Sequence, residues 1–293
     1  MTERRRLVRV PASSANLGPG YDVLAAALSA HLELEVTETG SFGVDAGGLP
    51  VPEDRSNLCV SAFERLHTAD GLHFELRGDI PVAAGLGASA AAIVAGLLAA
   101  EHLYELALDR EALLAHAVEL EGHPDNVAAA VYGGFVICSS RDGTVAATRL
   151  DPPEGVEAVV VIPEDEEVLT EDARRAIPSE VPLDDAISNV AAASLLVLGI
   201  QRSDLSLIER GLADRIHQPR RAGLYPRSIE LVERAPGLGA IGATISGAGP
   251  SVLVWTLWQN TGKVVEALRE RTEGWAEVRR TPFSPLGADV PEL

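Results

Sequence analysis

The chain has 293 residues, with 43 acidic against 24 basic side chains and a formal net charge of −19. This length suits one large domain or two domains that share a cleft, and an apolar content of 46% is enough for a core. The acidic balance disfavours nucleic acid and anionic membrane surfaces as partners. A site for an anionic ligand would therefore need a local source of positive charge, such as a helix N-terminus, Mg²⁺ or a few arginines.

The two cysteines, Cys59 and Cys138, lie in apolar stretches. We interpret them as buried free thiols rather than as a disulfide or a reactive thiol. The first six residues are basic, but no apolar segment follows them, and no run of about 18 apolar residues is found. We therefore expect no membrane span and a cytoplasmic location.

The N-terminal region begins with an alternating stretch, 7–10, that predicts a short strand ending at Pro11. The next segment, 11–22 (PASSANLGPGYD), predicts a tight loop of small residues that presents Asn16 and Asp22. A surface turn held by Asn and Asp side chains is the alternative.

Two strands and a helix are predicted between this loop and residue 76. Residues 31–36 and 72–76 alternate as strands do, and 57–67 has the apolar spacing of a helix, with Ser56 as its N-cap.

A glycine-rich stretch, 80–92 (IPVAAGLGASAAA), leads into a predicted helix over 89–103. Glycines let a backbone approach a ligand closely, and the first N–H groups of a helix lack partners and carry partial positive charge. We interpret the stretch as a phosphate cradle, with the Ser89 hydroxyl facing a metal ion or a phosphate oxygen. The alternative is a plain turn before a buried helix, because two glycines alone are a weak signal.

A second helix, 110–121, is predicted with Asp109 as its cap, and it runs into the polar turn 121–126 (EGHPDN). A carboxylate at a helix C-terminus faces the negative pole of the dipole, so a nearby cation would explain Glu121. An ordinary solvated helix end is the alternative. Residues 131–139 then predict a buried strand.

The second half of the chain follows a predicted linker at 151–155. A strand is expected at 158–162, a helix capped by Thr170, a helix at 184–198 and a final helix at 263–272, with a loop-like tail from 282. Residues 241–255 predict a strand, a glycine turn that presses against another backbone, and a second strand. Between these elements, 214–221 gathers three arginines and His217, to which we assign either a functional role or solvated surface charge.

Three separated motifs, at 11–22, 81–92 and 246–251, resemble those of the GHMP kinase superfamily (galacto-, homoserine, mevalonate and phosphomevalonate kinases) in order and spacing. Within it, the first motif, the turn 121–126 and the stretch 214–219 (DRIHQP) look most like the homoserine kinase family.

The resemblance spans residues 7 to 280 and implies a two-layer α+β fold of two domains. The first, 1–152, would be like ribosomal protein S5 domain 2, and the second, 153–293, would be ferredoxin-like, with ATP in the cleft between them. It also implies ATP-dependent phosphorylation of the L-homoserine side-chain hydroxyl, a step of threonine biosynthesis. The partners would be L-homoserine and ATP with Mg²⁺, without nucleic acid or membrane, and a homodimer is left open.

The resemblance also implies site residues by position. Ser89 and Glu121 would bind Mg²⁺, with Glu119 as an open alternative to Glu121, and Asn126 and Ser89 would act in catalysis. The ATP-binding residues implied, with Asn57 near the adenine, are Asn57, Pro81, Ala83, Ala84, Gly85, Leu86, Gly87, Ala88, Ser89, Ala90 and Ala91. The substrate-binding residues implied, with the arginines pairing with a carboxylate through forked hydrogen bonds, are Asn16, Asp22, His123, Asp125, Asn126, Thr170, Arg174, Arg221 and Gly247.

Two positions depart from the superfamily pattern. Ala88 replaces the first serine of the usual Gly-Leu-Gly-Ser-Ser, which predicts weaker ATP binding if that hydroxyl matters. Asn126 stands where several members have a catalytic Asp, so we expect Asn126 to orient the hydroxyl while its proton goes to the γ-phosphate or water.

Three alternatives remain open from the sequence. One is another GHMP kinase acting on a mevalonate-type or sugar alcohol, and the second is a catalytically silent ATP-binding sensor. The third is a structural or interaction protein whose glycine loop is fortuitous.

Overall fold

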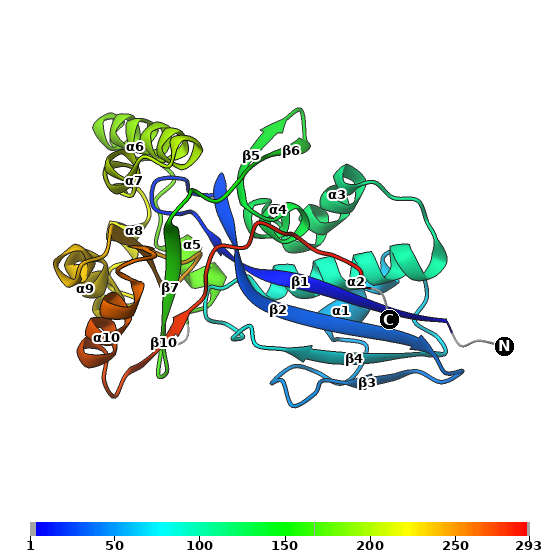
Figure 1. The fold of residues 1–293 in the computed structure, drawn as a ribbon. Coiled ribbons are helices and arrows are strands. Elements are labelled where there is room, and N and C mark those ends of the chain that lie inside the picture. The colour runs from blue at the N-terminus through cyan, green and yellow to red at the C-terminus, as the bar shows by residue number, and fades with distance from the viewer. Residues whose placement is uncertain (1–3, 167, 292–293) are drawn as a thin grey trace.

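Two sheets, each with helices against it, make up the computed structural model, which describes residues 4–166 and 168–291 (Figure 1). The elements of the first part are β1 (Arg5–Ala15), β2 (Leu24–Glu38), β3 (Gly43–Asp45), α1 (Leu58–Glu64), β4 (Leu72–Gly78), α2 (Ala88–Tyr104), α3 (Arg110–Glu121), α4 (Asp125–Tyr132), β5 (Phe135–Arg141) and β6 (Thr144–Leu150). Those of the second are β7 (Val156–Pro163), α5 (Thr170–Arg175), α6 (Leu183–Arg202), α7 (Leu205–Gly211), α8 (Gln218–Arg221), α9 (Pro226–Arg234), the 3₁₀ turn η1 (Ala235–Leu238), β8 (Gly242–Ile245), β9 (Val252–Leu257), α10 (Thr261–Arg271) and β10 (Ala276–Arg280).

The first sheet has the strand order β3-β4-β2-β5-β6, with β1 pairing with β2, and the second has the order β10-β7-β9-β8. Helices α2 and α4 pack on β1 and β2, whereas α9 and α10 pack on the second sheet. The expected α+β fold is therefore confirmed. The boundary at residue 152 stays a prediction, and the tail returns to the first sheet, where Phe283 bridges to Leu28 and Asp289 to Arg9.

Most predicted elements are present, with four corrections of detail. Strand β1 does not end at Pro11 but continues to Ala15, because the β1–β2 register shifts between Pro11 and Ala12, where a residue without an N–H is tolerated. The N-cap of α1 is Asn57 rather than Ser56, since the Asn57 side chain accepts a hydrogen bond from the Cys59 N–H.

The other two corrections concern 131–139 and Thr170. Residues 131 and 132 end helix α4, and Gly133 and Gly134, both with positive φ, separate it from β5. Thr170 is the first residue of α5 rather than its cap, and Leu169 occupies the cap position without a side-chain bond. Short elements such as α7, α8 and β10 were not predicted, because their few residues carry little periodicity.

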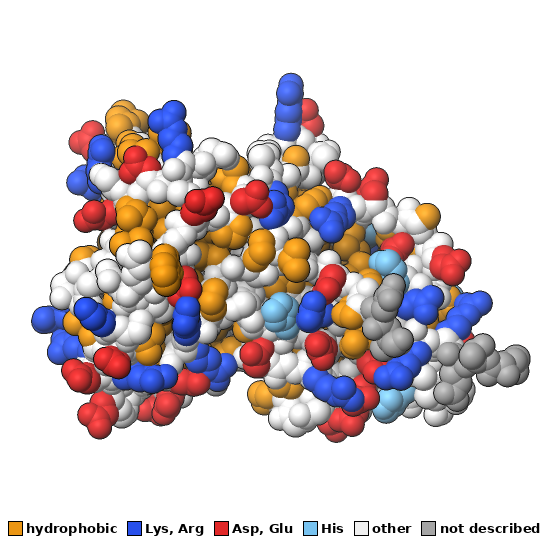
Figure 2. Space-filling model, in the orientation of Figure 1, with side chains coloured by type: hydrophobic (Ala, Val, Ile, Leu, Met, Phe, Trp, Pro, Cys, Tyr) orange, Lys and Arg blue, Asp and Glu red, His pale blue; other side chains and the backbone are white. Residues whose placement is uncertain are grey.

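Helix α6 lies at the edge of the molecule above α7 (Figure 1), and Figure 2 shows apolar side chains over it and toward β5. Among the described helices it alone is long and apolar enough to cross a membrane by length and composition, with a mean hydropathy of 1.5. Polar residues interrupt it, so it is not an unbroken apolar run, and the expectation of no membrane span stays a prediction. Its inner face belongs to the folded protein, because Asn189 donates hydrogen bonds to Pro19 and Asp214.

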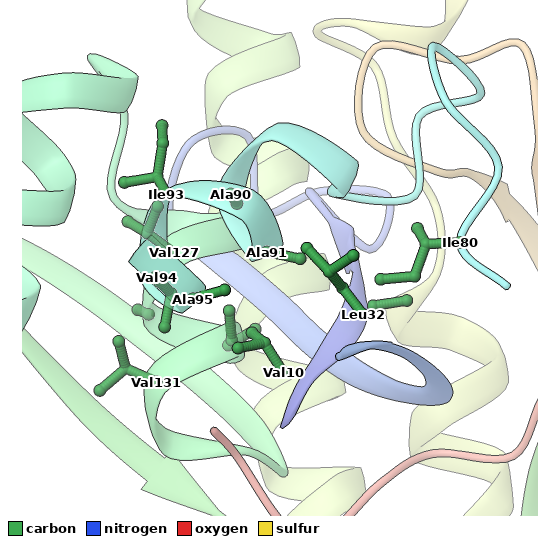
Figure 3. Close-up of a cluster of buried hydrophobic side chains, with 14 of the residues drawn as sticks. Val10, Leu32, Ile80, Ala90, Ala91, Ile93, Val94, Ala95, Val127 and Val131 are labelled. Carbon is green, nitrogen blue, oxygen red and sulfur yellow. The ribbon is translucent and has the colours of Figure 1, made fainter. Parts of the chain in front are cut away.

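The core of the first part is built around α2, whose small side chains are buried on nearly all sides. Figure 3 shows Ala91, Val94 and Ala95 of α2 among Val10 and Val131 from β1 and α4. Small residues let these elements approach closely, which fixes the start of α2 against the sheet. Both cysteines are free and buried, as predicted.

An aromatic cluster joins the two sheets and the tail. Phe135 of β5 and Trp255 of β9 have ring centroids 5.6 Å apart, and Phe283 lies 4.7 and 4.9 Å from them, respectively. Because these rings come from three separate segments, their burial holds the two halves of the fold together.

We predict that Trp255→Ala lowers the free energy of unfolding by about 3–5 kcal/mol, the usual cost of removing a large buried aromatic side chain. Exposed Trp258 provides the control, and Trp258→Ala should change stability by less than about 0.5 kcal/mol. Urea denaturation of both variants measures this. Equal losses of stability in Trp255→Ala and Trp258→Ala would show that the aromatic cluster does not hold the two halves of the fold together.

Candidate functional site

A cavity of about 500 Å³ lies where the glycine loop, the 16–22 loop, the α3–α4 turn, the 168–174 segment and the β8–β9 turn converge. Most sequence-predicted site residues line it. These are Asn16, Asp22, Asn57, Ala83, Ala84, Gly85, Leu86, Gly87, Ala88, Ser89, Glu121, His123, Asp125, Asn126, Thr170, Arg174, Arg221 and Gly247. Pro81, Ala90 and Ala91 do not line it, and the two alanines are buried in the core instead.

The glycine loop turns sharply into α2. Gly85 and Gly87 have φ values of 76° and 71°, and Gly87 is the N-cap of α2 without any side-chain cap. The first N–H groups of this 17-residue helix therefore point out of the helix beside the cavity. Such a helix start attracts anions such as phosphate through these N–H groups and the helix dipole.

The β8–β9 turn holds the glycine loop by direct contacts. The Ser246 hydroxyl donates a hydrogen bond to the Gly85 carbonyl at 2.7 Å, and its oxygen also lies 2.8 Å from the Ser14 hydroxyl, within hydrogen-bond distance. A Cβ at Gly85 would lie 2.5 Å from the Ser246 carbonyl oxygen, so only glycine permits this approach. The predicted pressing of one glycine turn on another backbone is thus present.

Ser89 and Glu121 meet at one side of the loop. The Ser89 hydroxyl donates a hydrogen bond to Glu121 Oε1 at 2.7 Å. Burial raises the pKa of Glu121, and the bond from Ser89 offsets part of that rise. Glu119 instead pairs with Arg65 and is 60% exposed, so of the two glutamates only Glu121 lies beside Ser89.

This pair suits a divalent cation. A hydroxyl and a carboxylate are the hard oxygen ligands that Mg²⁺ takes alongside phosphates and water, and a cation would offset the cost of the desolvated Glu121 charge. No group of three or more His, Cys, Asp or Glu side chains suited to a metal is found among the described residues. A cation here would therefore rely on ligand oxygens as well.

Two arginines also line the cavity. Arg174 forms a forked pair with Asp22, with N–O distances of 2.7 and 3.0 Å, and also donates to the Tyr21 hydroxyl. Arg221 is only 2% exposed and donates to the carbonyls of Ala173 and Gly247. Arg221 forms no ion pair with a carboxylate in the part of the chain that the structure describes. A buried guanidinium without a carboxylate favours an anionic ligand.

His217 orients Arg221. Its Nε2 lies 2.7 Å from the Gly18 carbonyl, which only accepts, so Nε2 carries the hydrogen. Burial lowers the pKa of His217, Asp214 opposes this effect and Arg221 adds to it. Nδ1 is then free to accept from Arg221 Nη1 at 3.3 Å. Two interpretations were left open for the 214–221 stretch. His217 has a structural role, because it holds Arg221, whereas Arg221 itself lines the cavity.

The loop 16–22 is fixed by Asn16. Its Nδ2 donates to the Gly247 carbonyl at 2.8 Å and its Oδ1 accepts from the Asp22 N–H at 3.1 Å. The amide thus ties the loop to the β8–β9 turn and presents Asp22 to the cavity.

The start of α4 places Asp125 and Asn126 at the centre of the cavity wall. Asp125 is 3% exposed, and burial raises its pKa to about 7. Asn126 Oδ1 accepts a hydrogen bond from the Ser13 hydroxyl at 2.9 Å. With its Oδ1 bonded to Ser13, Asn126 has its Nδ2 donor remaining for another contact.

Three other predicted residues also line the cavity. The Asn57 amide caps Cys59 and donates to the Pro52 carbonyl, so its side chain serves the protein's own turn. Burial lowers the pKa of His123, whose Nδ1 lies 3.9 Å from Glu121 Oε1. Thr170 is exposed at the first turn of α5.

Sequence reasoning missed two parts of the cavity. Ser13 was placed in a loop without a role, although it binds Asn126. The apolar part of the wall was also missed, because it comes from segments far apart in the sequence, of which only the glycine-rich stretch with Ile80 and Val82 is marked by a motif: Leu32, Leu49, Pro50, Val51, Pro52, Leu58, Leu76, Ile80 and Val82.

Two family models match the chain: the GHMP kinases N terminal domain at residues 57–134 and the GHMP kinases C terminal at residues 196–276. The chain belongs to the GHMP kinase family. It is 40% identical to the homoserine kinase of Thermus thermophilus over 264 residues, which cover 88% of this chain and 89% of that protein. It is 38% identical to the homoserine kinase of Moorella thermoacetica over 258 residues, covering 85% and 86%, respectively.

Among solved structures, the homoserine kinase of Cytophaga hutchinsonii superposes with a TM-score of 0.88 at 29% identity. The match covers 99% of this chain and 98% of that one. The two-domain kinase fold therefore extends over the whole described chain.

We predict that Gly85→Ala destabilises the protein more than Gly40→Ala. Both positions have positive φ, which costs a non-glycine residue about 1 kcal/mol. A Cβ at Gly40 meets open space, whereas one at Gly85 meets backbone oxygens, which adds about 1–3 kcal/mol. Urea denaturation measures the stability of both variants. Equal losses of stability would contradict the close approach of the glycine loop and the β8–β9 turn.

Asp125 predicts a pH dependence of stability. Its folded pKa of about 7 lies above the unfolded value of about 3.9. Its stabilising contribution is therefore full below about pH 4 and is lost as the pH rises to about 7. Asp125→Asn, which keeps an acceptor for the Asn126 N–H, should gain stability relative to the parent at about pH 8 but not at about pH 4. A pH-independent difference in urea denaturation would contradict this assignment.

Proposed function

We propose that this GHMP kinase phosphorylates the side-chain hydroxyl of L-homoserine with ATP, giving O-phospho-L-homoserine for threonine biosynthesis. The observation that carries the proposal is the buried guanidinium of Arg221 facing the same cavity as the glycine loop. The cavity thus offers two anion sites, one for phosphates and one for a carboxylate. The 38–40% identity to homoserine kinases supports the same substrate.

ATP would bind with its phosphates at the loop from Ala83 to Ser89. Backbone N–H groups supply the contacts there, so Ala88 in place of the usual serine removes a hydroxyl but not an N–H. The adenine would lie on the apolar wall near Asn57, since that wall provides the flat, non-polar surface that a base needs.

Mg²⁺ would be held by Ser89 and Glu121, because these two side chains meet beside the phosphate loop. When bound, the ion would neutralise charge on the transferring phosphoryl group. Glu121 would remain ionised beside it, despite the burial that raises its pKa.

The amino-acid end of L-homoserine would lie at Arg221 and Arg174, with Thr170 at the rim. Arg221 would pair with the carboxylate through its forked N–H groups. Asp22 lies within the same pocket and would attract the ammonium group, while it also holds Arg174 in place.

Asn126 would orient the reacting hydroxyl. Its Oδ1 is bonded to Ser13 and its Nδ2 can donate to an oxygen, but a neutral amide is not a base, so Asn126 binds the hydroxyl and cannot accept its proton. The proton would go to the γ-phosphate or water, since phosphoryl transfer through a loose transition state depends mainly on position and charge neutralisation.

The remaining expectations belong to the same proposal. We infer a cytoplasmic enzyme, divided near residue 152, that uses no nucleic acid or membrane partner. The net charge of −19 supports the exclusion of polyanionic partners.

Steady-state ADP release with L-homoserine, mevalonate and galactose tests the proposal. We expect turnover that depends on L-homoserine and on Mg²⁺. Turnover with mevalonate or galactose alone would favour the other GHMP kinases, and ATP binding without turnover on any alcohol would favour a sensor. Absence of any thermal stabilisation by Mg-ATP would reject nucleotide binding itself.

We predict that Arg221→Lys raises KM for L-homoserine about tenfold or more and leaves KM for ATP nearly unchanged. Lysine keeps the charge but loses the planar fork. Arg215→Lys is the control, because Arg215 is exposed and outside the cavity. An effect confined to KM for ATP would contradict the assignment of the carboxylate end.

A further inference from the structure

Tyr21 lies in the cavity wall beside both of the arginines that line it. It directly precedes Asp22, whose backbone N–H is bound by the Asn16 side chain, and it is partly buried. The loop therefore gives the phenol ring a defined place in the wall, next to the proposed carboxylate end.

The ring of Tyr21 contacts side chains from two helices of the second part of the chain. Its centroid lies 5.6 Å from Cζ of Arg174 in α5 and 5.4 Å from Cζ of Arg221 in α8. A guanidinium within about 6 Å of an aromatic ring is attracted to it. The ring also lies 5.5 Å from that of His217, which accepts a hydrogen bond from Arg221. One aromatic ring thus helps to set the positions of both arginines.

The Tyr21 hydroxyl has a donor that the protein does not use. Its oxygen accepts a hydrogen bond from Arg174 Nη1 at 3.0 Å, and an arginine only donates, so the hydrogen of the hydroxyl takes no part in this bond. No described residue accepts that hydrogen. Burial raises the pKa of Tyr21 and Asp22 adds to the rise, while Arg174 and Arg221 oppose it. The phenol is therefore protonated near neutral pH and has one O–H group for a ligand.

Arg221 also has donors left for a ligand. Its Nε donates to the Ala173 carbonyl, and its Nη1 donates to the Gly247 carbonyl and to His217 Nδ1. The two hydrogens of Nη2 have no acceptor among the described residues. A carboxylate offers about four acceptor positions on its two oxygens, which is more than Nη2 alone can fill. A second donor close to Arg221 would complete the site, and the Tyr21 hydroxyl is such a donor.

We propose that Tyr21 is a further substrate-binding residue, whose hydroxyl donates a hydrogen bond to the carboxylate of the amino acid while its ring holds the two arginines in position. Asp22 already offsets the charge of Arg174 through their forked pair. An uncharged phenol therefore strengthens the carboxylate site without a second unpaired charge in the cavity. The inference rests on the proposed function and deepens it, because it says how the same acceptor is held at its carboxylate.

Tyr21→Phe removes the hydroxyl but keeps the ring, so it tests the hydrogen bond alone. We expect KM for L-homoserine to rise about tenfold, the usual effect of losing one hydrogen bond to a charged group. KM for ATP should change by less than about twofold, because the contact lies at the acceptor. Tyr104→Phe is the matched control, since Tyr104 stacks on His67 outside the cavity, and it should leave both KM values as in the parent. A parental KM for L-homoserine in Tyr21→Phe would overturn the role of the hydroxyl.

Two fragments of the acceptor locate the contact. L-2-aminobutyrate keeps the carboxylate and the ammonium group of L-homoserine but lacks its hydroxyl, whereas the amino alcohol 3-aminopropan-1-ol lacks the carboxylate. When both are used as competitive inhibitors, Tyr21→Phe should weaken L-2-aminobutyrate about tenfold and leave 3-aminopropan-1-ol unchanged. Equal weakening of the two would show that the variant disturbs the whole cavity, and it would overturn the proposed contact.

Tyr21→Leu tests the ring. We expect KM for L-homoserine to rise several-fold beyond that of Tyr21→Phe, because both arginines lose their aromatic contact. Equal KM values in the two variants would overturn the positioning role of the ring. A parent enzyme without L-homoserine turnover would reject the proposed function and this inference together. A parent that turns over L-homoserine, with Tyr21→Phe and Tyr21→Leu indistinguishable from it, would reject the role of Tyr21 alone.

Discussion

The contact between the glycine loop and the β8–β9 turn fixes the geometry of the site. Ser246 binds the Gly85 carbonyl from one side of that turn, and the Gly247 carbonyl accepts from Asn16 and Arg221 on the other. One short turn thus contacts both the loop that we propose to bind phosphates and the arginine that we propose to bind a carboxylate. The separation of the two proposed anion sites is therefore set by buried side-chain contacts to the backbone of two short turns, which suits a reaction that depends on position.

The cavity is lined by two arginines, although the protein as a whole carries a large negative charge. A chain with a net charge of −19 repels anions at long range, so its anion sites must be local and partly buried. Arg221 is buried among carbonyls, and Asp125 is buried with its pKa raised to about 7. Both groups cost stability in the folded protein, a cost typical of residues retained for binding rather than for packing.

Local features were predictable from the sequence, and long-range ones were not. The glycine loop, α2 and the Asp109 cap depend on neighbours a few residues away, so residue type and spacing predict them. The continuation of β1 past Pro11 depends on a register shift against β2. Likewise, the choice of Glu121 over Glu119 depends on Ser89, and the burial of Arg221 on segments from three other parts of the chain.

A crystal structure with L-homoserine, Mg²⁺ and a non-hydrolysable ATP analogue tests this account most directly. We expect the phosphates against the backbone from Gly85 to Ser89, the carboxylate of L-homoserine on Arg221, and its hydroxyl near Asn126 and turned toward the γ-phosphate. An amino acid bound away from Arg221, or phosphates bound away from the start of α2, would contradict the account.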